Sequence, residues 1–121
     1  MSTFLVGIGW SDPEEVAAYE RVGLDDDPRC STGLFLDAST QEEALSWADK
    51  VAANYMEFLF RQKQHPQKAF EVFCWVEERP ESSAWKHCLG FFQRIAVGQF
   101  PDFQNMTTEA YTEWCRRAGI A

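Results

Sequence analysis

The segment from Thr40 to Gln62 constrains the fold more than any other part of this 121-residue chain. Its apolar side chains recur at the spacing that places them along one face of an α-helix. These residues are Ala44, Trp47, Ala48, Val51, Ala52, Tyr55, Phe58 and Leu59. Ser39 and Glu42 form a capping-box pattern at its start, and His65-Pro66 ends it, because a residue before proline avoids the helical region. A helix of this length must bury its apolar face against a second layer.

Three segments with strand-forming composition supply that layer: 3–9, 32–38 and 68–78. In the third segment, alternation places four side chains on one face, namely Phe70, Val72, Cys74 and Val76. We expect this face to be buried against the long helix, together with Val51, Tyr55 and Phe58. Phe73 and Trp75 fall on the other face, and the pattern leaves open whether they are exposed or buried.

A short helix is expected after the first strand. Asp12 can cap it, Pro13 suits its first position, and Gly23 closes it. The two glutamates that follow Pro13 lie where the helix dipole favours negative charge.

The C-terminal third of the sequence is less regular. Apolar residues recur at helical spacing over 83–97, which predicts a helix, but Gly90 leaves a strand over 88–97 as an alternative. A last helix is expected to start after Thr107 or Thr108 and to stop at Gly119. Its inward residues are expected to be Tyr111, Trp114 and Cys115.

The order of these elements predicts one α+β domain over residues 1–121, since no repeat or linker divides the chain. We expect a small, mainly antiparallel sheet of three or four strands, covered on one face by helices. A ferredoxin-like or otherwise split arrangement of strands is the first expectation.

The charge balance narrows the class of partner. Eleven Lys and Arg against nineteen Asp and Glu give a net charge of -8. This deficit of cations argues against nucleic acid as a direct ligand, because phosphate binding depends on Lys and Arg. No run of about 18 apolar residues and no basic leader is present, which predicts a cytoplasmic protein without a membrane partner. The four cysteines form no CxxC pair and are expected to be reduced thiols.

The motifs that carry common chemistry are incomplete. His87 and Cys88 are neighbours, but no second ligand pair lies at a zinc-site interval. Asp25–Asp27 lack the alternation and the glycine of a calcium loop, and Gly7–Gly9 lack the third glycine of a dinucleotide loop. We therefore expect no cofactor, no bound metal and no catalytic residue.

Two surface features are candidates for partner binding. The stretch from Asp12 to Asp27 contains seven carboxylates against Arg21 alone, a local net charge of -6. Tryptophan is favoured as an anchor in protein interfaces. Trp10 lies just before the acidic stretch, and Trp75 lies on the less apolar face of the third predicted strand. The predicted partner-binding residues are Trp10, Asp12, Glu14, Glu15, Asp25, Asp26, Asp27 and Trp75.

These features favour a small acidic, non-enzymatic binding protein. We expect an inhibitor or immunity-type protein that neutralises a basic protein partner, such as a toxin, nuclease or effector, by occlusion; bacterial immunity proteins have this general size and charge. One alternative is a structural or adaptor subunit that joins a larger assembly through its aromatic surface. Another is an enzyme whose carboxylate-based site is not visible in the sequence.

Overall fold

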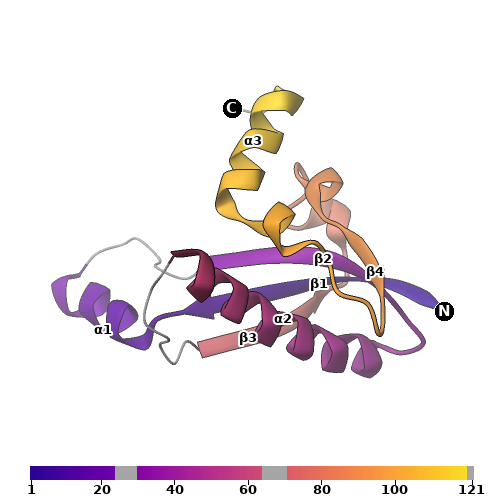
Figure 1. The fold of residues 1–121 in the computed structure, drawn as a ribbon, viewed down its shortest axis with the longest axis horizontal. Coiled ribbons are helices and arrows are strands. Elements are labelled where there is room, and N and C mark those ends of the chain that lie inside the picture. The colour runs from indigo at the N-terminus through magenta and orange to yellow at the C-terminus, as the bar shows by residue number, and fades with distance from the viewer. Residues whose placement is uncertain (24–29, 64–70, 120–121) are drawn as a thin grey trace.

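The computed structural model describes residues 1–23, 30–63 and 71–119 and confirms the α+β class (Figure 1). The strands are β1 (Ser2–Ser11), β2 (Cys30–Ala38), β3 (Glu71–Glu77) and β4 (Arg94–Ala96). The helices are α1 (Pro13–Val22), α2 (Gln41–Lys63) and α3 (Thr108–Ala118). Short 3-10 turns lie at Pro80–Ser82, Leu89–Phe91 and Phe103–Met106.

The four strands form one mixed sheet in the order β3-β1-β2-β4. β1 pairs antiparallel with both β2 and β3, and β4 adds in parallel to the outer edge of β2. β2 and β3 therefore run in the same direction with β1 between them, so β2-α2-β3 is a split crossover unit of the kind that was expected. The sheet is not ferredoxin-like, because the two strands joined through α1 pair directly with each other in antiparallel fashion.

The main core lies between α2 and one face of the sheet. Alternate residues of the two central strands meet the small residues of the helix, which allow the helix to approach closely. The fully buried residues of this cluster are Val6, Ile8, Leu34, Leu36, Ala38, Ala44, Ala48, Val51 and Ala52. Each fully buried Leu, Ile or Val contributes about 1.5–3 kcal/mol relative to an exposed position. Of the three helices, α2 alone covers this face, whereas several helices had been expected there.

Capping residues determine where the helices begin and end. The Glu43 backbone N–H donates to the Thr40 hydroxyl at 3.1 Å, and the Ser39 N–H donates to the Glu43 carboxylate at 3.3 Å, so the capping motif of α2 falls one residue later than predicted. Asp12 and Thr107 cap α1 and α3 as predicted, each accepting a backbone N–H from the first turn. Both helices end at a left-handed glycine, Gly23 and Gly119.

The predicted core is corrected at one exposed residue and at three half-buried residues, of which Cys74 is one. Val72 is 41% exposed, because β3 is an edge strand and Val72 lies near its start. Val51 and Tyr55 are buried as expected, and Val76 is half-buried. Phe58 is also half-buried, and Phe70 lies outside the described residues.

The segment 83–97 is neither a continuous helix nor a long strand. It forms irregular turns and then the three-residue β4. Its regularly spaced rings, Trp85 and Phe92 among them, pack on the sheet from an irregular chain, so tertiary contacts override the local helical spacing. In the last helix, Tyr111 is 39% exposed rather than inward, while Trp114 and Cys115 are half-buried.

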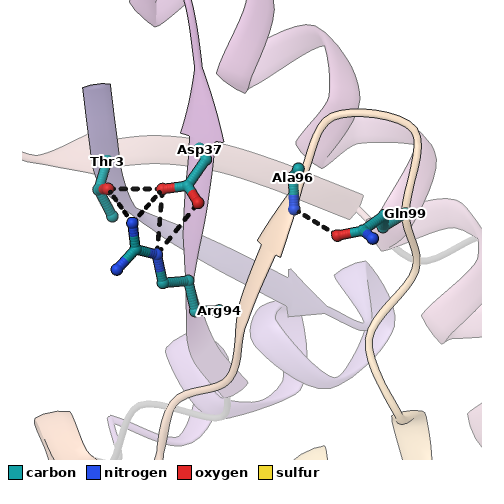
Figure 2. A network of polar contacts seen from close by, with 5 residues as sticks. All are labelled: Thr3, Asp37, Arg94, Ala96 and Gln99. Carbon is teal, nitrogen blue, oxygen red and sulfur yellow. Dashed lines mark hydrogen bonds and ion pairs between the residues drawn. The ribbon is translucent and has the colours of Figure 1, made fainter. Parts of the chain in front are cut away.

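A polar network fixes the short β4 to the rest of the sheet (Figure 2). Arg94 Nε donates to both carboxylate oxygens of Asp37 at 3.1 Å, and Arg94 Nη2 donates to the Thr3 hydroxyl at 3.1 Å. The Thr3 hydroxyl in turn donates to Asp37. The hydrogen bond from Thr3, followed by that from Arg94, lowers the pKa of the Asp37 carboxyl below its ordinary value. Three strands are thereby joined by side chains as well as by the backbone ladder.

Candidate functional site

α1 forms an acidic helix that stands apart from the core. Figure 1 shows it at the end of the sheet where β1 ends, beyond the layer formed by α2. Glu14, Glu15 and Glu20 are all exposed, and none of its ten residues is buried. A helix in a globular domain normally buries an apolar stripe. In this helix Val16, Ala18 and Tyr19 are only half-buried, and the three glutamates are exposed to its surroundings.

The sequence-predicted acidic residues have different positions. Asp12 caps α1, its carboxylate accepting the Glu14 backbone N–H at 2.9 Å, so it also has a structural role. Glu14 and Glu15 are exposed in the first turn of the same helix. Asp25, Asp26 and Asp27 lie outside the described residues.

The two predicted aromatic anchors lie on opposite faces of the sheet. Trp10 faces α2, where its ring meets that of Tyr55 edge-on at 5.5 Å between centroids. Trp75 faces the other way and lies against Gly7 of β1. The structure therefore does not bring these two tryptophans together on one surface.

The face opposite α2 carries a continuous row of rings, which we call the aromatic tract. It runs through Phe73, Trp75, Trp85, Phe92 and Phe91, and the distances between successive ring centroids are 5.6, 5.7, 5.1 and 6.1 Å. Such spacings are typical of favourable aromatic contacts. Phe91 continues the row to Tyr111 and Trp114 of α3, at 5.2 and 5.8 Å.

Glycines in the central strands β1 and β2 leave the space in which the rings of the aromatic tract pack. A Cβ atom on Gly9 would come within 2.4 Å of the Phe73 ring, and one on Gly33 would come within 3.0 Å of Trp85 and 3.1 Å of Phe92. Only glycine leaves the backbone open to rings at this range. The packing of the tract therefore requires glycine in both β1 and β2.

The exposed end of the tract lies at β3, which answers the question that the strand pattern left open. Phe73 is 43% exposed, whereas Trp75 is half-buried and its indole N–H donates to Glu77 at 2.8 Å. Glu71 and Glu77 share this face of β3, since they alternate in step with the two rings. At β3, the edge of the aromatic tract therefore carries both an exposed ring, that of Phe73, and the carboxylates of Glu71 and Glu77.

The local sequence pattern does not identify Trp85, Phe91 and Phe92 as parts of this surface. A signal was present, since Gly7, Gly9 and Gly33 are glycines inside predicted strands. Glycine within a strand often marks the close approach of another group. The identity of that group depends on long-range packing, which the local pattern does not contain.

The four cysteines lie within the described residues, and no disulfide joins any of them, as predicted. Burial, helped by a hydrogen bond to Asp49, raises the pKa of the Cys74 thiol to about 12. Burial also raises the pKa of Cys88. These two thiols are therefore protonated at neutral pH and are weak nucleophiles.

Within 1–23, 30–63 and 71–119, no cluster of three or more His, Cys, Asp and Glu side chains is arranged to hold a metal ion. The described helices include none with the length and apolar character needed to cross a bilayer. Comparisons of the chain with protein-family models, with curated proteins and with solved structures find no match.

Proposed function

We propose that this protein is a non-enzymatic binding module that docks a basic protein partner and occludes its working surface. The observation that carries the proposal is the acidic helix, which presents three glutamates and buries none of its ten residues in its own chain. Complementary charge of this kind accelerates association with a cationic surface.

The exposed end of the aromatic tract adjoins the acidic helix. Phe73 pairs with Gly9 and Glu71 pairs with Ser11, one residue before the N-cap of α1. Charge and apolar area therefore meet at one end of the sheet. A cationic partner steered by α1 would bury Phe73, and its Arg or Lys side chains would pair with Glu71.

The proposal is tested by neutralising the acidic helix. The triple variant Glu14→Gln, Glu15→Gln, Glu20→Gln removes charge and keeps side-chain size. Affinity capture at low salt followed by mass spectrometry should recover a basic protein with the wild type and much less of it with the variant. Stopped-flow mixing of that partner should then show association slowed at least tenfold by the variant at low salt and little at high salt, where screening hides the charges.

A matched control removes the same number of carboxylates elsewhere. Glu42, Glu78 and Glu81 are exposed and lie outside α1, so their replacement by Gln changes net charge equally. We expect this control to associate at nearly the wild-type rate. Equal slowing by both triple variants, or equal association rates for the wild type and the α1 variant at low salt, would contradict a role for α1.

A second candidate function, an adaptor subunit of a larger assembly, is favoured by the exposure of Phe73 at the end of the aromatic tract. Such a subunit would bind through apolar burial, and its association would depend little on ionic strength. Phe73→Ser would then abolish assembly at both low and high salt. The α1 triple variant would leave assembly intact.

A further inference from the structure

A small cavity lies at the open edge of β2, near the end of the sheet that carries α1. It has a volume of about 200 Å³ and is formed by the ends of β1 and β2, by α2, by the turns before β4 and by the start of α3. Six aromatic side chains contribute to its wall: Trp10, Tyr55, Trp85, Phe91, Phe92 and Tyr111. The volume is below the roughly 300 Å³ at which pockets for drug-sized ligands begin, so the cavity suits one side chain.

The cavity contains a hydroxyl group whose hydrogen-bonding capacity is unused. Thr32 lines it and is only 6% exposed, yet its hydroxyl has no hydrogen-bond partner among the described residues. The neighbouring Thr107 differs, because its hydroxyl donates to Gln104 and accepts from the Ala110 N–H. No fully buried side-chain oxygen or nitrogen of the described residues lacks a hydrogen-bond partner, so the Thr32 oxygen is accessible from the cavity, where a ligand can bind it.

The backbone of β2 adds hydrogen-bonding groups at the same place. The Phe35 N–H donates to the Gln93 carbonyl of the neighbouring segment at 2.8 Å, so the odd residues of β2 direct their backbone groups away from β1. β4 pairs only with Phe35–Asp37. Ser31, which lines the cavity, therefore directs its carbonyl oxygen to the part of the edge that β4 does not cover.

Charged residues of both signs lie beside the lining residues, since Lys86 directly follows Trp85 in the sequence. None of its lining residues is charged. Asp12 follows Trp10 by two residues, and Glu109 follows Thr108. Burial raises the pKa of Tyr55, and the negative charge of Glu109 raises it further. Aromatic faces attract cations, and acidic neighbours strengthen that attraction.

We propose that this cavity receives an arginine side chain of the basic partner, an inference that rests on the proposed function. The planar guanidinium stacks on the ring walls and donates to the Thr32 hydroxyl and the Ser31 carbonyl, while the aliphatic stem packs against the other rings that line the cavity. Arginine suits this setting better than lysine, because its cation is more weakly hydrated and stacks on aromatic faces.

The probe is N-acetyl-arginine methylamide, titrated into the protein and followed by amide NMR shifts of Ser31, Thr32 and Thr108. We expect saturable binding with a millimolar Kd. The neutral isostere, the citrulline derivative, should bind at least tenfold more weakly, and the lysine derivative should lie between the two. Equal binding of the citrulline derivative, or preferred binding of the aspartate derivative at the start of α3, would overturn the proposal.

Thr32→Val tests the role of the hydroxyl with little change in shape. It should weaken binding of the arginine derivative about tenfold, the loss expected for one hydrogen bond to a charged group. Thr112→Val is the matched control, because Thr112 is exposed on α3 and does not line the cavity. Equal affinities of the wild type and Thr32→Val would refute the proposed contact.

The two proposals can fail separately. If the arginine derivative does not bind but the captured partner still depends on α1, the cavity proposal is wrong and the proposed function stands. If the derivative binds and Thr32→Val weakens it, while the partner associates equally with the α1 triple variant, the cavity proposal stands and steering by α1 is wrong.

Discussion

The ring of Trp75 occupies the space that a side chain on Gly7 would fill. The two residues lie directly opposite each other on antiparallel strands, and a Cβ atom on Gly7 would come within 2.3 Å of two ring carbons. A shift of β3 by one residue would turn Trp75 to the other face of the sheet. The pair therefore fixes the register of β3 as well as the position of the aromatic tract.

Gly7→Ala is expected to destabilise the protein by about 1–3 kcal/mol, the usual cost of overpacking a well-filled site. The Trp75 ring has little room to move, since it is stacked between Phe73 and Trp85. Urea denaturation with an unchanged m-value would measure the loss. Gly90→Ala is the control, because a Cβ there would lie 3.5 Å from Trp114, an ordinary contact.

A double-mutant cycle isolates the steric origin of that loss. In a Trp75→Leu background the bulky ring is absent, so Gly7→Ala should cost much less than it does in the wild type. The same cost in both backgrounds would mean that the backbone of β1, rather than the ring, requires glycine at this position.

The central strand β2 and the edge strand β3 predict unequal effects of truncating side chains on the same face of the sheet. Leu36→Ala removes a fully buried side chain and should cost about 2–5 kcal/mol. Val72→Ala should change the free energy of unfolding by about 0.5 kcal/mol or less, because Val72 is 41% exposed. Thermal or urea unfolding of the two variants compares them directly. A large loss in Val72→Ala would show that this end of β3 is covered in solution.

The hydrogen bonds to Asp37 predict that its contribution to the free energy of unfolding decreases as the pH falls. Its pKa is lowered in the folded state, so its contribution is present above the unfolded pKa of about 4 and is lost as the pH falls through the folded value. Asp37→Asn should therefore lower stability at pH 7 and have a smaller effect near about pH 3. Denaturation at the two pH values tests this, with the exposed Glu78→Gln as control. A difference that grows on acidification would contradict the stabilising contacts of Thr3 and Arg94.

The parts of the fold that the sequence predicted correctly have local causes. The helix over 41–63 follows from its apolar periodicity, and the limits of α1 and α3 follow from Asp12, Thr107 and two glycines. Each of these signals acts within a few residues of the element that it defines.

The parts that it missed have long-range causes. Trp85 and Phe92 recur at helical spacing, but their rings pack against the backbone of Gly33, which is far away in the sequence. The exposure of Val72 depends on strand order, which alternation along one strand does not reveal. The candidate surface was found in part, since Trp75 was identified while the rings that continue it were not.

The cysteines should react in an order set by exposure and pKa. Cys30 is exposed and should react first with a disulfide reagent at pH 8. Cys74 should react far more slowly, because a pKa of about 12 leaves on the order of a thousandfold less thiolate than an ordinary cysteine. Under denaturing, non-reducing conditions all four thiols should be counted. A count of two or zero would contradict the reduced state.

α1 should open independently of the rest of the fold. It buries no residue, whereas α2 buries Ala44, Ala48, Val51 and Ala52 against the sheet, and local stability follows such contacts. Hydrogen exchange in α1 should therefore be much faster than in the middle of α2. Ala17→Gly lowers helix propensity by about 1 kcal/mol at an exposed position and should accelerate exchange in α1 without moving the urea midpoint. Ala48→Gly, at a fully buried position in α2, should lower that midpoint clearly. If Ala17→Gly lowers the midpoint as much as Ala48→Gly does, α1 belongs to the cooperative unit and does not open independently.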